Sequence, residues 1–195
     1  MKKELSEMTL TELWELFPIF LTAPNPNWNK QYLEEEKLLT SCLPWGSKIR
    51  ISQIGSTAIK NIWAKNIVDI LAEIPAELSM GVYKDVLLKN NYLCHNEEKG
   101  RLDFNKGYTS DGFADKVFHL HLRYIGDNDE LYFRDYLNEH EEAAKEYEKL
   151  KLSLWPLYEH DRDGYTKAKG EFIQKYTILA KKENPHKYAN LKGEQ

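Results

Sequence analysis

The segment IGSTAIKNIWAKNIVDIL, residues 54–71, decides how this chain folds. Alternating apolar and polar residues over 49–54 predict a half-buried strand that ends at Gly55-Ser56, and the apolar run 67–74 predicts a second strand. Asp69 stands inside the second strand, although an ionised carboxylate is costly to bury without a partner. A Gly-Ser turn lets a phosphate approach backbone N–H groups. The two features indicate either a phosphate-and-metal site or a plain turn with Asp69 capping a neighbouring element.

The composition bounds the class of protein. The 195 residues are 42% hydrophobic and 30% charged, enough for a sizeable core in a single domain, 1–195. The net charge of -4, from 27 basic and 31 acidic residues, predicts neither a general nucleic-acid binder nor a binder of anionic membranes. Cys42 and Cys94 form no metal or redox motif, which favours a reducing compartment. Because we find no signal-peptide pattern and no apolar run of about 18 residues, we expect a cytoplasmic protein.

Strand patterns lie in the middle of the chain, with helical patterns before, between and after them. The predicted strands are 49–54, 67–74, 92–95, 102–106 and 116–124, with a polar loop over 107–115. The predicted helices are 28–43, 79–90, 130–155 and 165–182, the last capped by Asp163. Glu34-Glu35-Glu36 is typical of a solvated helix face. This order predicts an α+β (α/β) fold, a small mixed β-sheet flanked by helices, with a core over about 24–126 and a C-terminal helical part over about 130–182.

A row of polar side chains follows one face of the strand predicted over 116–124. His119, His121 and Arg123 alternate with apolar residues, and residues two apart on a strand point to the same side. Two imidazoles on one face can share a metal ion, and Asp69 from a neighbouring strand can complete the ligand set. The same row is also typical of a solvent-facing side of a sheet, so both interpretations stay open.

Cationic residues scattered through the chain are candidates for binding phosphate. They are Lys65, Lys106, Arg123, Arg134 and Lys169. Arg134 can equally form a structural ion pair with Asp135, and Lys169 can point to water. The sequence contains no Gly-x-x-x-x-Gly-Lys loop, no Gly-x-Gly-x-x-Gly and no Gly-x-Ser-x-Gly, so the kinase-type P-loop, Rossmann and serine-hydrolase classes have no local support.

Several ordered motifs resemble the GrpB-like family, which belongs to the nucleotidyltransferase superfamily. Gly55-Ser56-Thr57-Ala58 followed by Asp69 looks like the family's Gly-Ser-Thr-Ala core. His119-Leu120-His121 looks like its His-Leu-His strand, and residues 131–137 with Tyr147 look like the helix that follows its sheet. The resemblance covers about residues 24–180. It implies a nucleotidyltransferase-like fold, with Gly-Ser at the end of one strand and an acidic residue on the next.

The chain departs from the pattern of active superfamily members. In those proteins Gly-Ser holds a triphosphate, and a pair of carboxylates spaced Asp-x-Asp or Asp-x-Glu, plus a third, holds two Mg²⁺ ions. Here Leu71 stands two residues after Asp69, and the third carboxylate is either Asp103 or replaced by the histidine strand. One carboxylate with two histidines favours a softer ion, such as Zn²⁺ or Mn²⁺.

The resemblance and the motifs together predict metal-dependent nucleotidyl or phosphoryl transfer to an unknown small molecule. The expected partner is a nucleotide or another phosphorylated small molecule, not a nucleic acid or a membrane, and the aromatic content is compatible with a homodimer. The expected cofactor is a divalent metal ion (Mg²⁺, Mn²⁺ or Zn²⁺). The alternatives are a non-catalytic nucleotide- or protein-binding module and a metal-dependent hydrolase that uses the histidine row. The expected catalytic and metal-binding residues are Asp69, His119 and His121, and the expected phosphate-binding residues are Gly55, Ser56, Thr57, Lys65, Lys106 and Arg123.

Overall fold

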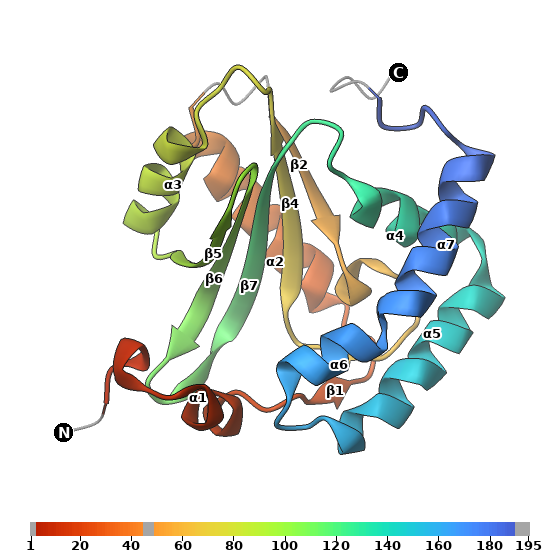
Figure 1. Cartoon of the computed structure of the whole chain (residues 1–195), viewed down its shortest axis with the longest axis horizontal. Coiled ribbons are helices and arrows are strands. Elements are labelled where there is room, and N and C mark those ends of the chain that lie inside the picture. The colour runs from red at the N-terminus through yellow and green to blue at the C-terminus, as the bar shows by residue number, and fades with distance from the viewer. Residues whose placement is uncertain (1–2, 45–48, 190–195) are drawn as a thin grey trace.

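A five-stranded mixed sheet, in the order β2-β4-β7-β6-β5, forms the centre of the computed structural model, which describes residues 3–44 and 49–189 (Figure 1). The strands are β2 (Arg50–Ile54), β4 (Val68–Ile74), β5 (Leu93–Glu98), β6 (Arg101–Thr109) and β7 (Gly112–Tyr124). β4 and β7 are parallel, and the other neighbouring pairs are antiparallel. A separate two-stranded sheet pairs β1 (Leu21–Thr22) with β3 (Ala64–Lys65).

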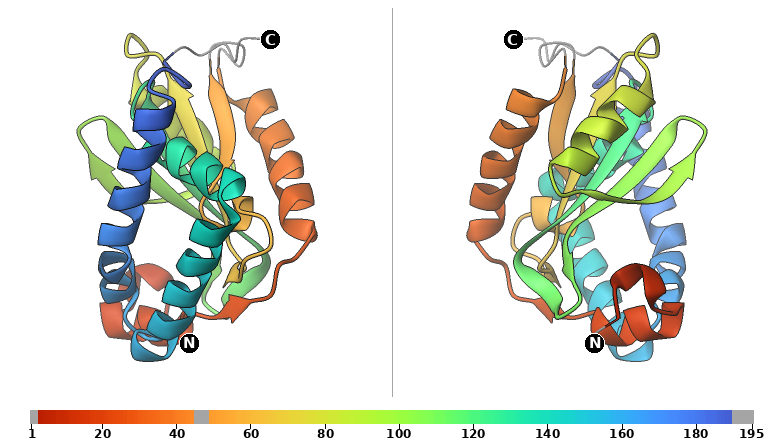
Figure 2. Two further views of the ribbon diagram at one scale, coloured as in Figure 1. Left: turned by 90° about the vertical axis from the view of Figure 1, so that its right-hand side faces the viewer. Right: turned by 90° about the vertical axis from the view of Figure 1, so that its left-hand side faces the viewer.

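Helices cover both faces of the central sheet (Figure 2). On one face lie α2 (Asn27–Cys42) and α3 (Met80–Lys89), and on the other lie α4 (Asp129–Glu139), α5 (Glu141–Leu154), α6 (Arg162–Ala168) and α7 (Gly170–Glu183). The remaining elements are α1 (Leu10–Leu16) and the 3-10 turns η1 (Leu5–Glu7), η3 (Ser56–Ala58) and η4 (Trp155–Leu157). The predicted α+β class, a small mixed sheet flanked by helices, is confirmed. Within the described ranges, no helix is both long enough and apolar enough to cross a membrane.

The alternation of β7 divides the apolar side of the sheet from the polar side. Phe118, Leu120 and Leu122 are at most 3% exposed and belong to the main core, together with the buried faces of α2 and α3. His119, His121 and their neighbour Arg123 point to the opposite face, as the period of two requires. The predicted division of this strand into an apolar and a polar face is confirmed.

Four predicted element boundaries are wrong. The helix predicted over 165–182 is two helices, α6 and α7, which meet at Lys169. The helix predicted over 130–155 is two helices, because His140 leaves the helical region (φ -125°, ψ 88°) and stacks on Tyr136. The polar loop predicted over 107–115 is the end of the β6–β7 hairpin, and the bulge there is formed by Gly107, whose φ is 87°. Asp161, not Asp163, caps the helix that follows, since its side chain accepts the N–H of Gly164.

Candidate functional site

The Gly55 turn and Asp69 form a single site. Ile54, the last residue of β2, pairs with Asp69 of β4, so the turn that follows β2 lies directly beside the carboxylate. Gly55 has φ 68° and ψ -169°, a conformation essentially restricted to glycine. A Cβ at this position would overlap Asp69 Oδ2. The absence of a side chain therefore allows the backbone and the carboxylate to approach each other closely.

The residues after Gly55 form the short turn η3, which is held from two sides. The Thr57 carbonyl accepts a hydrogen bond from Gln53 Nε2 at 3.3 Å, and the Thr57 side chain is buried. On the other side, Asn138 of α4 donates to the Ala58 carbonyl at 2.9 Å. Burial raises the pKa of Tyr147 in α5 to about 12, and Ser56 opposes this shift. The sheet and the C-terminal helices thus fix the Gly-Ser turn between them.

A chain of hydrogen bonds runs from Asp69 to α6. His119 Nδ1 lies 3.1 Å from Asp69 Oδ1, and His119 Nε2 lies 2.7 Å from the Tyr108 hydroxyl. Arg162 donates to the Tyr108 oxygen at 2.8 Å, which leaves the Tyr108 hydrogen to be donated to His119 Nε2. The Nδ1–H of His119 then points at Asp69. This tautomer is neutral, in agreement with the burial that lowers the pKa of His119 to about 4.

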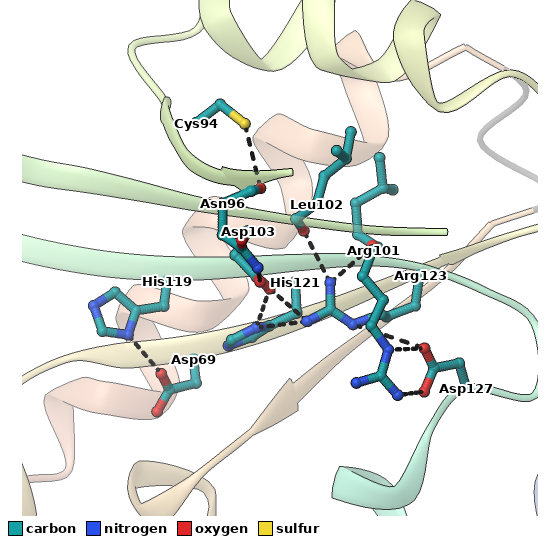
Figure 3. A network of polar contacts seen from close by, with 11 residues as sticks. Asp69, Cys94, Asn96, Arg101, Leu102, Asp103, His119, His121, Arg123 and Asp127 are labelled. Atoms are coloured by element: carbon teal, nitrogen blue, oxygen red, sulfur yellow. Dashed lines mark hydrogen bonds and ion pairs between the residues drawn. The ribbon is translucent and has the colours of Figure 1, made fainter. Parts of the chain in front are cut away.

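His121 belongs to a different network (Figure 3). Its Nδ1 lies 2.8 Å from Asp103 Oδ1 of β6, and Asp103 also accepts hydrogen bonds from Arg123 and Asn96. These hydrogen bonds oppose the effect of burial and lower the pKa of Asp103 well below its usual range. The two histidines of the row are therefore bound to two different carboxylates.

The structure does not bring Asp69, His119 and His121 together as one set of metal ligands. Within the described ranges, no group of three or more His, Cys, Asp or Glu side chains is placed to hold a metal ion. Both nitrogens of His119 have partners, and Leu71, at the position of the second carboxylate in active superfamily members, is fully buried. The donor set does not fit a zinc site made by protein ligands alone.

Asp69 alone fits a different kind of ion. Its Oδ1 accepts from His119, while no described residue donates to its Oδ2. Mg²⁺ usually keeps several water molecules and is held by one or two carboxylates together with substrate phosphates. Burial would raise the pKa of Asp69, but the hydrogen bond from His119 and the positive charge of Lys65 contribute to lowering it. The carboxylate is therefore ionised at neutral pH, as such a ligand must be.

The predicted phosphate-binding cations have different surroundings. Lys106 Nζ lies 2.7 Å from Glu35, a residue of α2 on the apolar side of the sheet, and it lies over the Tyr92 ring. Glu35 is 7% exposed, so the predicted solvated face of α2 is wrong at this position. Arg123 is buried and paired with Asp103. Of the three predicted cations, Lys65 is the one whose charge acts on Asp69.

The C-terminal helices contribute two further cations: Lys169, already a candidate from the sequence, and Lys151, which was not among those candidates. Burial lowers the pKa of Lys65 and of Lys151 (α5) to about 7 and that of Lys169, between α6 and α7, to about 8. Repulsion by neighbouring cations contributes for Lys65 and Lys151, and the charge of Asp69 opposes the shift in all three. The sequence feature that could have identified Lys151 is its spacing, since it follows Tyr147 by four residues and so lies on the apolar stripe of α5.

Comparisons with known proteins agree on a family. A family model described as GrpB protein matches residues 18–178. Glutamate-rich protein GrpB of Alkalihalophilus pseudofirmus is 34% identical over 162 residues, which cover 80% of this chain and 91% of that protein. UPF0157 protein YqkA of Bacillus subtilis is 30% identical over 174 residues, which cover 85% of this chain but 49% of YqkA.

A solved structure extends the likeness to three dimensions. The crystal structure of conserved protein GrpB from Enterococcus faecalis superposes with a TM-score of 0.72 at 26% identity, covering 84% of this chain and 98% of that one. A superposition on the Cid1 poly(U) polymerase scores 0.48 at 10% identity, over 73% of this chain and 44% of the polymerase, and says nothing about activity. On the matched residues and the shared fold, this chain belongs to the GrpB family.

Proposed function

We propose that the Gly55–Asp69 site binds a nucleotide or another phosphorylated small molecule together with a divalent metal ion, and transfers its nucleotidyl or phosphoryl group to a small acceptor. The observation that carries the proposal is the close approach of Gly55 to Asp69, which joins an open backbone turn to an ionised carboxylate. Backbone N–H groups in such turns bind phosphate oxygens, and the carboxylate supplies a ligand for the cation that accompanies them.

Each residue near Asp69 has a part in this proposal. The backbone of Gly55 and the turn residues Ser56 and Thr57 would bind phosphate, and Asp69 Oδ2 would hold the ion. When bound, a divalent ion stabilises the charge that develops on the phosphate oxygens. His119 fixes the orientation of Asp69 through the 3.1 Å hydrogen bond. Lys106 and Arg123 are left out of the site because carboxylates elsewhere in the fold already pair with them.

His121 is the candidate for proton transfer. Its Nδ1 is bound to Asp103, and no described residue contacts its Nε2 by a hydrogen bond. A carboxylate on Nδ1 fixes the tautomer that leaves the lone pair on the other nitrogen, which is the arrangement that a general base requires. In this role the Nε2 of His121 would take the proton of the acceptor hydroxyl. The acceptor oxygen would bond to the transferred phosphorus, and the rest of the donor would leave as the P–O bond between them breaks, taking that bond's electron pair.

A second candidate function is ligand binding without chemistry. The buried Leu71 favours it, because two-metal transfer sites need a second carboxylate near the first. In that case the turn and Asp69 would hold a nucleotide for recognition only. The two functions share a binding site and differ in whether the bound molecule is consumed.

The test is thermal stability with a panel of nucleotides, each with Mg²⁺, Mn²⁺ or Zn²⁺, on wild type, Asp69→Asn and the exposed control Asp115→Asn. A ligand at about 100 times its Kd adds roughly 2.7 kcal/mol, or about 5–10 °C in Tm for a chain of this size. We expect a metal-dependent shift in wild type and Asp115→Asn that Asp69→Asn loses. An equal shift in all three proteins, or none in wild type, would contradict the proposal.

Chromatography of the same mixtures after incubation separates the two functions. Turnover of the stabilising nucleotide by wild type, lost in Asp69→Asn, supports transfer once a candidate acceptor is supplied. Stabilisation without turnover across the acceptor panel supports the binding function.

A further inference from the structure

Four cations converge beside Asp69 from four parts of the chain. Lys65 comes from β3, Lys151 from α5, Arg162 begins α6, and Lys169 stands between α6 and α7. Their charges act on one another: Lys65 is repelled by Arg162 and Lys169, and Lys151 by Lys169 and Lys65. A fold that gathers like charges in this way stores repulsion, which an anion would relieve.

Two of the four cations donate hydrogen bonds to neutral groups. Lys151 donates to the Trp63 carbonyl, and Arg162 donates to the Tyr108 hydroxyl at 2.8 Å. Within the described residues, the ammonium groups of Lys65 and Lys169 have neither a hydrogen bond nor an ion pair; each instead lies over the ring of Tyr165, with Nζ at 5.8 Å and 4.3 Å from its centroid. Among the four cations, these two lysines are the ones whose charged groups have no hydrogen-bond partner among the described residues.

The acidic groups nearby do not balance this charge. Glu148, which acts on Lys151, already pairs with Lys145 at 3.0 Å. Asp69 is the one carboxylate that acts on Lys65 and Lys169 among the causes of their shifted pKa values. The region around the Tyr165 ring therefore carries an excess of positive charge, although the chain as a whole is acidic.

Tyr165 supplies an independent observation. The residue is 1% exposed, and its hydroxyl has no hydrogen-bond partner among the described residues. Leaving a buried hydroxyl without a partner is unfavourable for folding. The same ring lies under both lysine ammonium groups, so the unpartnered hydroxyl belongs to the residue around which the two charges gather.

We propose that Lys65, Lys169 and the Tyr165 hydroxyl form a subsite for an anionic group that carries at least two negative charges, such as the diphosphate segment of a ligand. The inference rests on the proposed function only in placing this segment on the same ligand that Asp69 binds. When both amines are protonated they require two negative charges for neutrality, so a single carboxylate or a neutral sugar does not match the subsite. The positive charge of Arg162, which acts on Lys65, adds to the positive electrostatic potential at the subsite.

Calorimetric titration with inorganic pyrophosphate, in EDTA and without metal, tests the subsite directly. We expect wild type to bind pyrophosphate at least tenfold more tightly than orthophosphate. Lys169→Met, which keeps the apolar stem but removes the charge, should weaken pyrophosphate binding at least tenfold, whereas Lys169→Arg should retain it. The matched control is Lys167→Met, since Lys167 lies two residues away in α6 and is exposed. Equal binding by wild type and Lys169→Met, or no preference for pyrophosphate, would overturn the inference.

The outcomes separate this inference from the proposed function. Circular dichroism and Tm verify that each variant is folded, and Tyr165→Phe provides a second variant that leaves every charge in place; we expect it to weaken pyrophosphate binding severalfold. If nucleotides with Mg²⁺ stabilise wild type in an Asp69-dependent manner but pyrophosphate does not bind, the subsite is rejected and the proposed function stands. If pyrophosphate binds as expected but no nucleotide shift depends on Asp69, the subsite stands and the proposed function fails.

Discussion

Gly55 decides the geometry of the site at the scale of a single residue. We expect Gly55→Ala to destabilise the protein by about 2–4 kcal/mol. An alanine at this position would have to adopt a backbone conformation that residues with a side chain avoid, and its Cβ would overlap Asp69. Gly126→Ala is the control, since Gly126 also has a positive φ (96°) but no atom lies within 4 Å of the place that its Cβ would take. Urea unfolding of the two variants measures the difference. A loss in Gly55→Ala no larger than in Gly126→Ala would show that the contact with Asp69 is unimportant.

The residue scale also shows what the sequence could predict of the site. Gly55-Ser56 and Asp69 are predictable because a turn after one strand and a carboxylate in the next are both read from local pattern, and pairing of Ile54 with Asp69 brings them together. The partners of the two histidines are not predictable in this way. Asp103 and Tyr108 come from β6, and which strand lies beside β7 is a matter of topology rather than of spacing.

At the scale of elements, α5 holds the connector between β2 and β4. Glu148 accepts the backbone N–H of Trp63 at 2.6 Å, and Lys151 donates to the carbonyl of the same residue. We expect Glu148→Ala to speed hydrogen exchange of the amides over 60–65 at least tenfold, since a hydrogen bond to a charged group is worth about 1.5–3 kcal/mol. The exposed Glu142→Ala, also on α5, should leave these amides unchanged.

Exchange that accelerates equally in the core strands of Glu148→Ala would instead indicate global destabilisation, and unchanged exchange over 60–65 would show that α5 does not restrain the connector. The connector matters for the site because it carries Lys65 at its end. Its position is thus set jointly by the sheet and by the C-terminal helices.

The elements themselves are largely predictable where a hydrophobic period is long. The buried stripe of α2 and the alternation of β7 are clear in the sequence, and both pack as expected. The break at His140 is not predictable from the sequence, because the apolar period of α4 continues in α5 and no helix-breaking residue such as proline interrupts it. The end of the β6–β7 hairpin resembles a loop in the sequence because its polar residues and two glycines hide a bulged ladder.

At the scale of the whole molecule, burial of the lysine cluster makes the stability depend on pH. Lys65 and Lys151 have folded-state pKa values of about 7, whereas a lysine in an unfolded chain titrates near 10.5. Above pH 7 the unfolded chain therefore holds more protons than the folded one, and the free energy of unfolding rises with pH. His119 is already neutral in this range, since its pKa is about 4.

The useful window ends below pH 9, because burial raises the pKa of the thiols of Cys42 and Cys94, and this shift opposes the effect of the lysines once unfolded thiols begin to ionise. Urea unfolding at pH 7.0 and 8.5 should show wild type more stable at the higher pH by at least about 1 kcal/mol. Lys65→Met, which removes one of the titrating groups, should show a smaller rise, and the exposed Lys60→Met should behave as wild type. A stability that falls or stays level from pH 7.0 to 8.5 in wild type would mean that these lysines keep their charge in the folded protein, and an unaltered rise in Lys65→Met would assign the effect to other groups.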